Sequence, residues 1–219
     1  KRSTSQEDRH LCAALIATQL MAIAGEAYLA VGDFPRAAQY FAQTTALEQG
    51  TRALSPVSGA DNAAYVVGNR SKERRNGGKL RDRDALLGDI ADSSPIYVKA
   101  SETIFVGAND GMLHAIDATS GVERFAYVPA GLDFAHLASL SDPQYVHRYF
   151  VDGPIAVSTQ VQTPSKNVLV GSLGRGGNGV FGLDVTAPST FSAGNVLWDA
   201  TGSALGADMG EVLGAPLII

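Results

Sequence analysis

The sequence predicts a mainly β protein, a partial β-propeller of four-stranded blades that follows an α-helical segment. Three observations support this prediction. A small residue, a proline and an aliphatic run recur at residues 94–98 (SPIYV), 153–157 (GPIAV) and 215–219 (APLII). The three prolines lie about 60 residues apart, and a fixed period of this kind marks stacked structural units. Short apolar runs separated by glycine-rich turns lie between them, which is typical of strands.

Each repeat contains four candidate strands. The first follows the proline, whose missing N–H is tolerated at the first residue of a strand, and we place it innermost in the blade. The remaining strands are expected at residues 103–107, 112–117 and 122–128 in one repeat, and at 167–171, 180–185 and 195–199 in the other. Aligning the repeats matches Val106-Gly107 with Val170-Gly171, Asp117 with Asp184, and Phe125 with Trp198.

This alignment makes specific structural predictions. Strands should begin near Pro95, Pro154 and Pro216, and Phe125 and Trp198 should be buried at equivalent positions. A glycine-containing turn separates the second and third strands of each repeat, at residues 109–111 (NDG) and at 174–179 (GRGGNG). Asp-Gly is a strong hairpin signal. No helix follows the second run to provide an anion site, so we interpret it as a flexible hairpin loop.

The chain is shorter than the fold that it implies. Propellers close with 4 to 8 blades, whereas this sequence contains two blades and the first strand of a third, which reaches Ile219. We therefore interpret it as a fragment of a longer protein. The incomplete propeller should have an exposed apolar edge, so we expect the 219-residue chain to self-associate.

Composition limits the functional classes. A net charge of −5 gives no electrostatic case for binding nucleic acid, and the single cysteine excludes an intramolecular disulfide. No apolar run is long enough to span a membrane. The stretch 11–24 has some features of a signal-peptide core, but the acidic Glu7 and Asp8 before it fit that interpretation badly.

The amino-terminal part has a different pattern. From residue 21 to 47, apolar and small residues recur at helical spacing, interrupted at Gly32-Asp33. Residues 20–47 resemble a single tetratricopeptide repeat, including a Gly-Asp-aromatic turn, and any other helical hairpin remains an equal alternative. One such repeat cannot bury its own apolar face. This resemblance implies a surface that binds a peptide or protein partner, and it implies no catalytic activity.

A polar connector precedes the blades. Residues 69–83 are rich in basic side chains, a pattern produced by a solvated loop or by a nucleic-acid patch. The interleaved Glu73, Asp82 and Asp84 argue against the patch. We divide the chain into a helical segment at 1–50, a connector at 51–92 and propeller blades at 93–219.

Several strings carry a family resemblance. They are residues 68–71 (GNRS), 79–83 (KLRDR), 87–98 (LGDIADSSPIYV), 105–115 (FVGANDGMLHA), 125–129 (FAYVP) and 147–153 (HRYFVDG). Together they resemble the propeller and its lead-in from the PilC/PilY family of type IV pilus tip-associated adhesins and assembly factors. The resemblance covers residues 51–219, and residues 1–50 depart from it.

The resemblance implies a non-enzymatic protein of the cell surface and pilus tip, exported through the periplasm and outer membrane. It implies roles in pilus biogenesis, host or surface adhesion and twitching motility. Its expected partners are pilus subunits, the minor pilins, and a host or surface receptor. Some family members carry an Asp-rich calcium loop, which is not found in this segment. Asn109 and Asp110 offer too few oxygen ligands for calcium, so we expect a hairpin turn and no cofactor here.

A second resemblance gives the main alternative function. Residues 115–125 (AIDATSGVERF) resemble the docking motif in the blades of quinoprotein dehydrogenases. In that motif the aspartate accepts hydrogen bonds from turn N–H groups, and the final aromatic packs between blades. The motif marks the blade type, but it keeps open a dehydrogenase dependent on pyrroloquinoline quinone and calcium. The chain lacks the adjacent cysteine pair that many of those enzymes carry.

We identify no catalytic, cofactor-binding or metal-binding residues. The histidines at positions 10, 114, 136 and 147 do not have the spacing of two ligands on one helix. His114 lies between apolar neighbours on a strand and is interpreted as a hydrogen-bonded core or interface residue. No nucleophile elbow or phosphate loop is found. A third function stays open, a tetratricopeptide scaffold for pilus or secretin assembly, which deletion of residues 1–50 would test.

Overall fold

A computed structural model describes residues 59–219. The expected helical segment at 1–50, with its tetratricopeptide-like stretch at 20–47, lies outside the described residues. The described residues fall into two compact units. The first contains residues 59–86 and 133–147, and the second contains 87–132 and 148–219. The domain boundaries that we place at residues 50 and 92 remain predictions.

The first unit combines short helices with the connector. Its elements are α4 (Gly59–Val66), the 3-10 turn η2 (Arg74–Asn76), α5 (Phe134–Ala138) and η4 (Ser139–Ser141). The backbone N–H of Arg81 donates to the carbonyl of Ser141, and the Ser141 hydroxyl donates to Asn62 Oδ1. Tyr65, Leu80 and Leu137 are buried there. Residues 133–147, which follow the first blade in sequence, thus pack with the connector.

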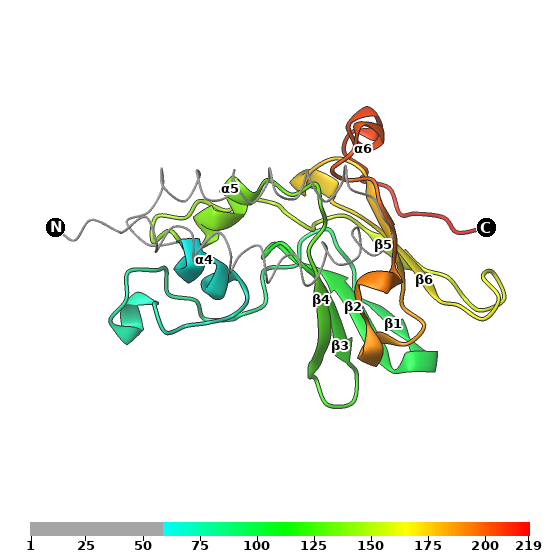
Figure 1. Ribbon diagram of the computed structural model, residues 1–219, viewed down its shortest axis with the longest axis horizontal. Coiled ribbons are helices and arrows are strands. Elements are labelled where there is room, and N and C mark those ends of the chain that lie inside the picture. The colour runs from blue at the N-terminus through cyan, green and yellow to red at the C-terminus, as the bar shows by residue number, and fades with distance from the viewer. Residues whose placement is uncertain (1–58) are drawn as a thin grey trace. The chain divides into compact units, whose positions relative to one another are not determined.

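The second unit contains two four-stranded antiparallel sheets. The first has the order β1 (Ile96–Val98), β2 (Thr103–Gly107), β3 (Leu113–Asp117) and β4 (Glu123–Tyr127). The second has the order β5 (Ile155–Val157), β6 (Val168–Ser172), β7 (Val180–Asp184) and β8 (Val196–Asp199). Each sheet is a meander in sequence order (Figure 1). The prediction of a mainly β, partial β-propeller is confirmed, and we call the sheets blade 1 and blade 2.

The central strands are buried along most of their length, and burial does not alternate strictly, since Val106 and His114 are buried as well as their neighbours. In blade 1, Phe105, Leu113 and Ala115 are fully buried. In blade 2, Leu169, Phe181 and Leu183 are fully buried. These aliphatic and aromatic side chains suit a pleated, buried surface, which is why the short runs form strands.

The repeat alignment is correct in its outer strands. Ala115 of β3 lies opposite Phe125 of β4, and Gly182 of β7 lies opposite Trp198 of β8. Counting two residues along β3 and β7 from these pairs reaches Asp117 and Asp184. The matches of Asp117 with Asp184 and of Phe125 with Trp198 are therefore confirmed by the strand register.

The alignment is wrong by one residue in the second strand. Thr103 lies opposite Asp117, and Val168 lies opposite Asp184. Val106 therefore corresponds to Gly171, and Gly107 corresponds to Ser172. The sequence match followed the shared Val-Gly letters, but backbone pairing sets the register, and a slip of one residue exchanges the two faces of a strand.

Two of the three proline-initiated strands are found. β1 begins at Ile96, directly after Pro95, and β5 begins at Ile155, directly after Pro154. The prediction for Pro216 is wrong, because residues 212–219 form no strand. A strand needs a ladder partner, and this segment pairs with no strand in the described part of the chain.

Shorter helical elements connect the strands of the second unit or, in the case of α6, follow the last strand. They are η3 (Lys99–Ser101), η5 (Gly174–Gly176), η6 (Pro188–Thr190), η7 (Ala193–Asn195) and α6 (Ala204–Met209). The Ser203 hydroxyl caps α6 by accepting a hydrogen bond from the Gly206 N–H. No helix among residues 59–219 has the length and apolar character to cross a membrane.

Candidate functional site

The aspartate of the docking-like motif caps the turn after β3. Oδ1 of Asp117 accepts hydrogen bonds from the backbone N–H groups of Thr119 and Ser120, at 2.9 and 2.8 Å. Its Oδ2 accepts a hydrogen bond of 2.5 Å from Arg124. The Arg124 guanidinium and these turn N–H groups hold the pKa of Asp117 well below its usual range. The expected structural role of the aspartate is confirmed.

The aromatic residue of the same motif lies between the blades. Phe125 of β4 stacks on Phe191, which follows η6 in the connection between β7 and β8. The ring centroids are 3.8 Å apart, and the ring planes differ by 9°. The motif therefore joins blade 1 to blade 2 through an aromatic pair, as expected for a structural docking element.

Blade 2 has a corresponding pair of residues, in which the aromatic ring is larger and the residue opposite it is smaller. Trp198 occupies the position of Phe125, and Gly182 occupies that of Ala115. A Cβ at Gly182 would lie 2.4 Å from Cε2 of Trp198, so the indole packs directly against the backbone of Gly182. Trp198 is 37% exposed. The prediction that Phe125 and Trp198 would both be buried is wrong: Phe125 is only partly buried, and Trp198 is more exposed because nothing in the described chain stacks on it as Phe191 stacks on Phe125.

A second connection between the blades centres on Asp199. Its Oδ2 accepts hydrogen bonds from the Tyr127 hydroxyl and from the backbone N–H of Ala130, at 2.5 and 2.8 Å. Its Oδ1 accepts from the backbone N–H and the hydroxyl of Thr201. The Tyr127 ring also contacts Phe181, with centroids 5.3 Å apart. Because Asp199 is buried, this network fixes the distance between the blades.

Asp199 is not among the residues singled out from the sequence, although the sequence contains a signal for it. The pattern Asp-x-Thr occurs at positions 117, 184 and 199. In all three cases Oδ1 of the aspartate accepts a hydrogen bond from the backbone N–H of the threonine. This is the Asx turn, which ends a strand by offering the backbone a side-chain acceptor. Only Asp199 also bonds to the other blade.

His114 is a buried, doubly hydrogen-bonded residue of β3. Its Nδ1 lies 2.6 Å from Glu123 Oε2, and its Nε2 lies 3.0 Å from Asp110 Oδ2. Burial disfavours the protonated imidazole, but the hydrogen bonds to Asp110 and Glu123 outweigh it and raise the pKa of His114 to about 9. The interpretation as a hydrogen-bonded core histidine is confirmed.

The other histidines do not join this network. His136 of α5 pairs with Asp133, and both belong to the first unit, as does His147. His10 lies outside the described residues. Within residues 59–219 no group of three or more His, Cys, Asp or Glu side chains could hold a metal ion.

The Asn109-Asp110-Gly111 segment forms the expected turn between β2 and β3. Gly111 has a φ of 95°, which favours glycine. Asp110 accepts hydrogen bonds from the backbone N–H groups of Gly88 and Met112. Asn109 accepts one from the backbone N–H of Phe150. The turn therefore fastens β2 and β3 to the chain segments that enter both blades.

The glycine run of blade 2 is closely packed. A Cβ on Gly176 would lie 1.8 Å from the carbonyl oxygen of Phe150, and one on Gly174 would lie 2.7 Å from the backbone of Gly153. Glycine is thus required because backbone passes directly against backbone. Nearby, Arg175 pairs with Asp92 and lies over the ring of Tyr149.

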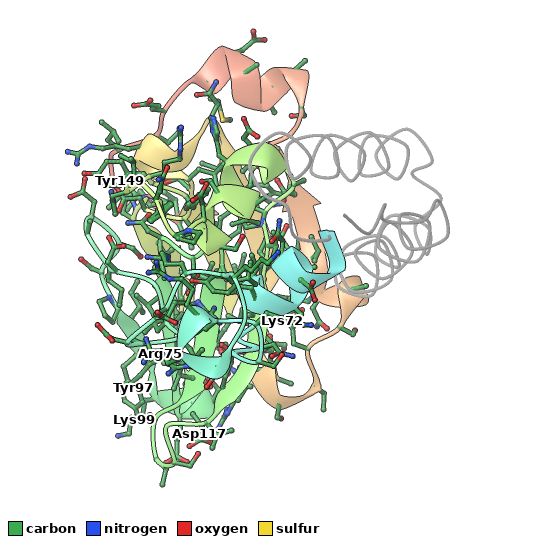
Figure 2. All side chains as sticks on the ribbon, turned by 90° about the vertical axis from the view of Figure 1, so that its left-hand side faces the viewer. Lys72, Arg75, Tyr97, Lys99, Asp117 and Tyr149 are labelled. Carbon is green, nitrogen blue, oxygen red and sulfur yellow. The ribbon has the colours of Figure 1, made fainter. Side chains whose placement is uncertain are left out.

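A groove of about 390 Å³ lies beside the innermost strands. It is lined by residues 96–100, residues 157–160 and Asn167, and it contains one cationic side chain, Lys99. Figure 2 shows Tyr97 and Lys99 at the same end of blade 1 as Asp117. The lining includes no carboxylate or histidine, so this groove lacks the side chains that most often hold a metal ion.

In the first unit, the connector folds around a buried ion pair. Glu73 is fully buried, and its Oε1 accepts a hydrogen bond of 2.9 Å from Arg83 Nε. Arg83 also lies over the Tyr65 ring. Burial raises the pKa of Glu73, but the hydrogen bonds from Arg83 outweigh it and leave the pKa lowered. The acidic residues of the connector thus neutralise its arginines, as Asp82 does for Arg75.

Known proteins similar to this chain share one family. A type IV pilus biogenesis factor PilY1 homolog of Xylella fastidiosa strain Temecula1 is 38% identical over 81% of this chain and 17% of its own length. A second homolog of that name, from the same strain, is 52% identical over 55% of this chain and 8% of its own. Type IV pilus biogenesis factor PilY1 of Pseudomonas aeruginosa strain PAK is 34% identical over 67% of this chain and 15% of its own.

The chain thus spans less than a fifth of the length of these relatives. No solved structure gives a significant match. The family model described as the PilY1 β-propeller domain matches residues 87–210, a range that contains all eight strands of both blades. By sequence and by fold, the chain belongs to the PilY1 β-propeller domain family.

Proposed function

We propose that this chain is part of a non-enzymatic protein of the type IV pilus that supports pilus biogenesis, host or surface adhesion and twitching motility. The observation that carries the proposal is the family match over residues 87–210, which coincides with the two blades. The relatives are named pilus biogenesis factors. Because this chain spans a small part of them, the activity is proposed for the parent protein.

The contacts between the blades support a structural role for this segment. The docking-like motif places Asp117 in a turn and Phe125 against Phe191, so its side chains hold the turn and the contact between the blades. Rigid blades position exposed loops for binding, as rigid scaffolds commonly do for the loops that carry binding residues. The proposed partners are minor pilins and a host or surface receptor, met at the cell surface or pilus tip after export through the periplasm and outer membrane.

Complementation of a strain that lacks the parent gene tests this proposal. The strain would receive the wild-type gene, a variant with Phe125→Ala and Asp199→Asn, or a control with Val161→Ala, whose side chain is 92% exposed. We expect the double variant to lose surface pili, surface attachment and the twitching zone, and the control to keep them. Immunoblots of cell fractions would measure export. Normal piliation by an exported double variant with disrupted blades would contradict the proposal.

Two further measurements separate the alternatives. The parent protein, incubated with pyrroloquinoline quinone, calcium and an alcohol, should reduce no electron-accepting dye. Dye reduction would instead favour the dehydrogenase. Deletion of residues 1–50 should leave attachment intact, whereas a tetratricopeptide scaffold would lose its function with that deletion.

A further inference from the structure

The groove beside the innermost strands contains hydrogen-bond donors that the fold does not use. Tyr97 of β1 is 54% exposed, Lys99 follows two residues later, and Gln160 lines the groove from the connection after β5. Within residues 59–219, the side chains of these three residues make no hydrogen bond or ion pair. Figure 2 shows Tyr97 and Lys99 together at one end of blade 1. Their polar groups are therefore available to an added molecule.

One wall of the groove is held in place by buried hydrogen bonds. Asn167 is 5% exposed, and its Nδ2 donates a hydrogen bond of 2.7 Å to the carbonyl of Ser158. The Ser158 hydroxyl accepts a hydrogen bond of 2.8 Å from the backbone N–H of Val168. This wall is thus ordered before any ligand arrives, which lowers the entropic cost of binding.

The charge of the groove favours an anionic ligand. Lys99 is the one charged side chain in the lining, which contains no aspartate or glutamate. An ammonium group binds a carboxylate through charge-assisted hydrogen bonds, which are about twice as strong as neutral ones. The Tyr97 hydroxyl and the Gln160 amide add two further donors. A free amino acid would find no acidic partner here for its own ammonium group, so the ligand should carry a carboxylate and no cation.

The distance between the walls argues against an extended peptide. Cα atoms of β1 and β5 approach within 8 Å of each other. A strand added between them would need two strand spacings, about 9.5 Å. The groove volume of about 390 Å³ lies within the range of pockets that hold small molecules, about 300–1,000 Å³. A compact ligand therefore suits this groove better than an added strand does.

The remaining lining suits a ring with one apolar face. Tyrosine combines an apolar ring face with a polar hydroxyl, and Ile96, Val98 and Val157 extend the apolar surface. A sugar ring has a C–H face that packs on such a surface and an edge of hydroxyl groups. The Gln160 amide can both donate to these hydroxyls and accept from them. This combination favours a carboxylated sugar over a linear carboxylate.

We propose that the groove between β1 and β5 binds an acidic sugar of the uronic acid class. Its carboxylate binds the Lys99 ammonium group, the C–H face of its ring packs on Tyr97, and the Gln160 amide binds its ring hydroxyls. The inference concerns binding by these residues and does not depend on the function proposed above.

Titration of the parent protein with sugars, followed by saturation-transfer difference NMR, tests the proposal. Glucuronate or galacturonate should bind about tenfold more tightly than glucose or galactose, which lack the carboxylate, and than glutarate, which lacks the ring. Lys99→Met should remove the preference for the uronate, and Tyr97→Ala should weaken the binding of both kinds of sugar. Lys79→Met changes an exposed lysine of the connector and is the matched control, which should bind the uronate like wild type.

Four results would overturn the proposal. Wild-type protein that binds neither uronate, or that binds neutral sugars equally well, would show that the groove does not recognise an acidic sugar. Glutarate binding as tight as that of the uronate would show that the ring is not recognised. Equal losses of affinity in Lys99→Met and Lys79→Met would show a general effect of net charge. Thermal unfolding of each variant would measure whether these exposed substitutions leave the fold intact.

Discussion

The hydroxyl of Tyr127 in blade 1 donates a hydrogen bond of 2.5 Å to Oδ2 of Asp199 in blade 2, 72 residues later in the chain. Asp199 also accepts hydrogen bonds from Ala130 and Thr201. A buried carboxylate with several donors is expensive to replace, because each donor left unpaired loses its hydration without compensation.

Asp199→Asn should therefore destabilise the second unit. In asparagine an NH2 group replaces one carboxylate oxygen, so a hydrogen-bond donor would face the donors that now bond to that oxygen. We expect a loss of about 1–3 kcal/mol in the free energy of unfolding. Tyr127→Phe should cost about 1 kcal/mol, because it removes one partner only. Urea unfolding measures both. Asp208→Asn, on the exposed side of α6, is the matched control and should have no effect.

The stability of blade 1 should fall at high pH. The folded-state pKa of His114 is about 9, against an ordinary histidine pKa of 6.5. A raised pKa contributes stability that is fully present below pH 6.5 and is lost as the pH rises through about 9. Unfolding of wild type and His114→Gln should show a difference that shrinks over this range. A constant difference would contradict the assignment, and His136→Gln serves as the surface control.

Gly182→Ala should displace the tryptophan. A Cβ would lie 2.4 Å from the indole, so the ring must move, and we expect a cost of about 1–3 kcal/mol from overpacking. Trp198 is the single tryptophan of the chain, so its fluorescence reports the displacement directly. Gly214→Ala is the control, because no atom lies within 4 Å of its added Cβ. Identical fluorescence spectra for both variants would show that Trp198 does not pack closely against Gly182.

Breaking the buried ion pair of the connector should be costly. Arg83→Met leaves the buried Glu73 with only Arg75, whose Nε lies 3.3 Å from its Oε2, and we expect a loss of about 3 kcal/mol in the free energy of unfolding. The double variant Glu73→Gln with Arg83→Met should lose less free energy of unfolding than the sum of the losses of the two single variants. Arg74→Met removes only an exposed pair with Asp82 and should cost less than about 1 kcal/mol. Resistance to limited proteolysis across residues 69–86 provides the measurement.

The 219-residue chain should self-associate in solution. Its exposed apolar residues include Trp198, Leu213, Leu217 and Ile219, and such surfaces favour association. Light scattering at several concentrations should give a dimer or larger species, or the chain should be poorly soluble. A version extended through further blades should be monomeric. A monomer mass that does not change with concentration for the short chain would contradict this prediction.

The sequence by itself determined the repeat and much of its local chemistry. Pro95 and Pro154 directly precede the first strands, where a missing N–H is tolerated, and Asp110-Gly111 forms a hairpin turn because glycine accepts a positive φ. Asp117 caps its turn for the same local reason. These features depend on residues that are close together in the chain, so a pattern of neighbours predicts them.

The tertiary structure determined which residues that are distant in the sequence contact one another. Pairing of Phe125 with Phe191 and of Tyr127 with Asp199 joins residues more than 60 positions apart, and no local pattern specifies such partners. The match of Val106-Gly107 with Val170-Gly171 failed because hydrogen-bonded pairing, and not shared letters, sets the register. Trp198 is half-covered and residues after Pro216 form no strand, because burial and strand formation both need a partner that the sequence pattern alone does not supply.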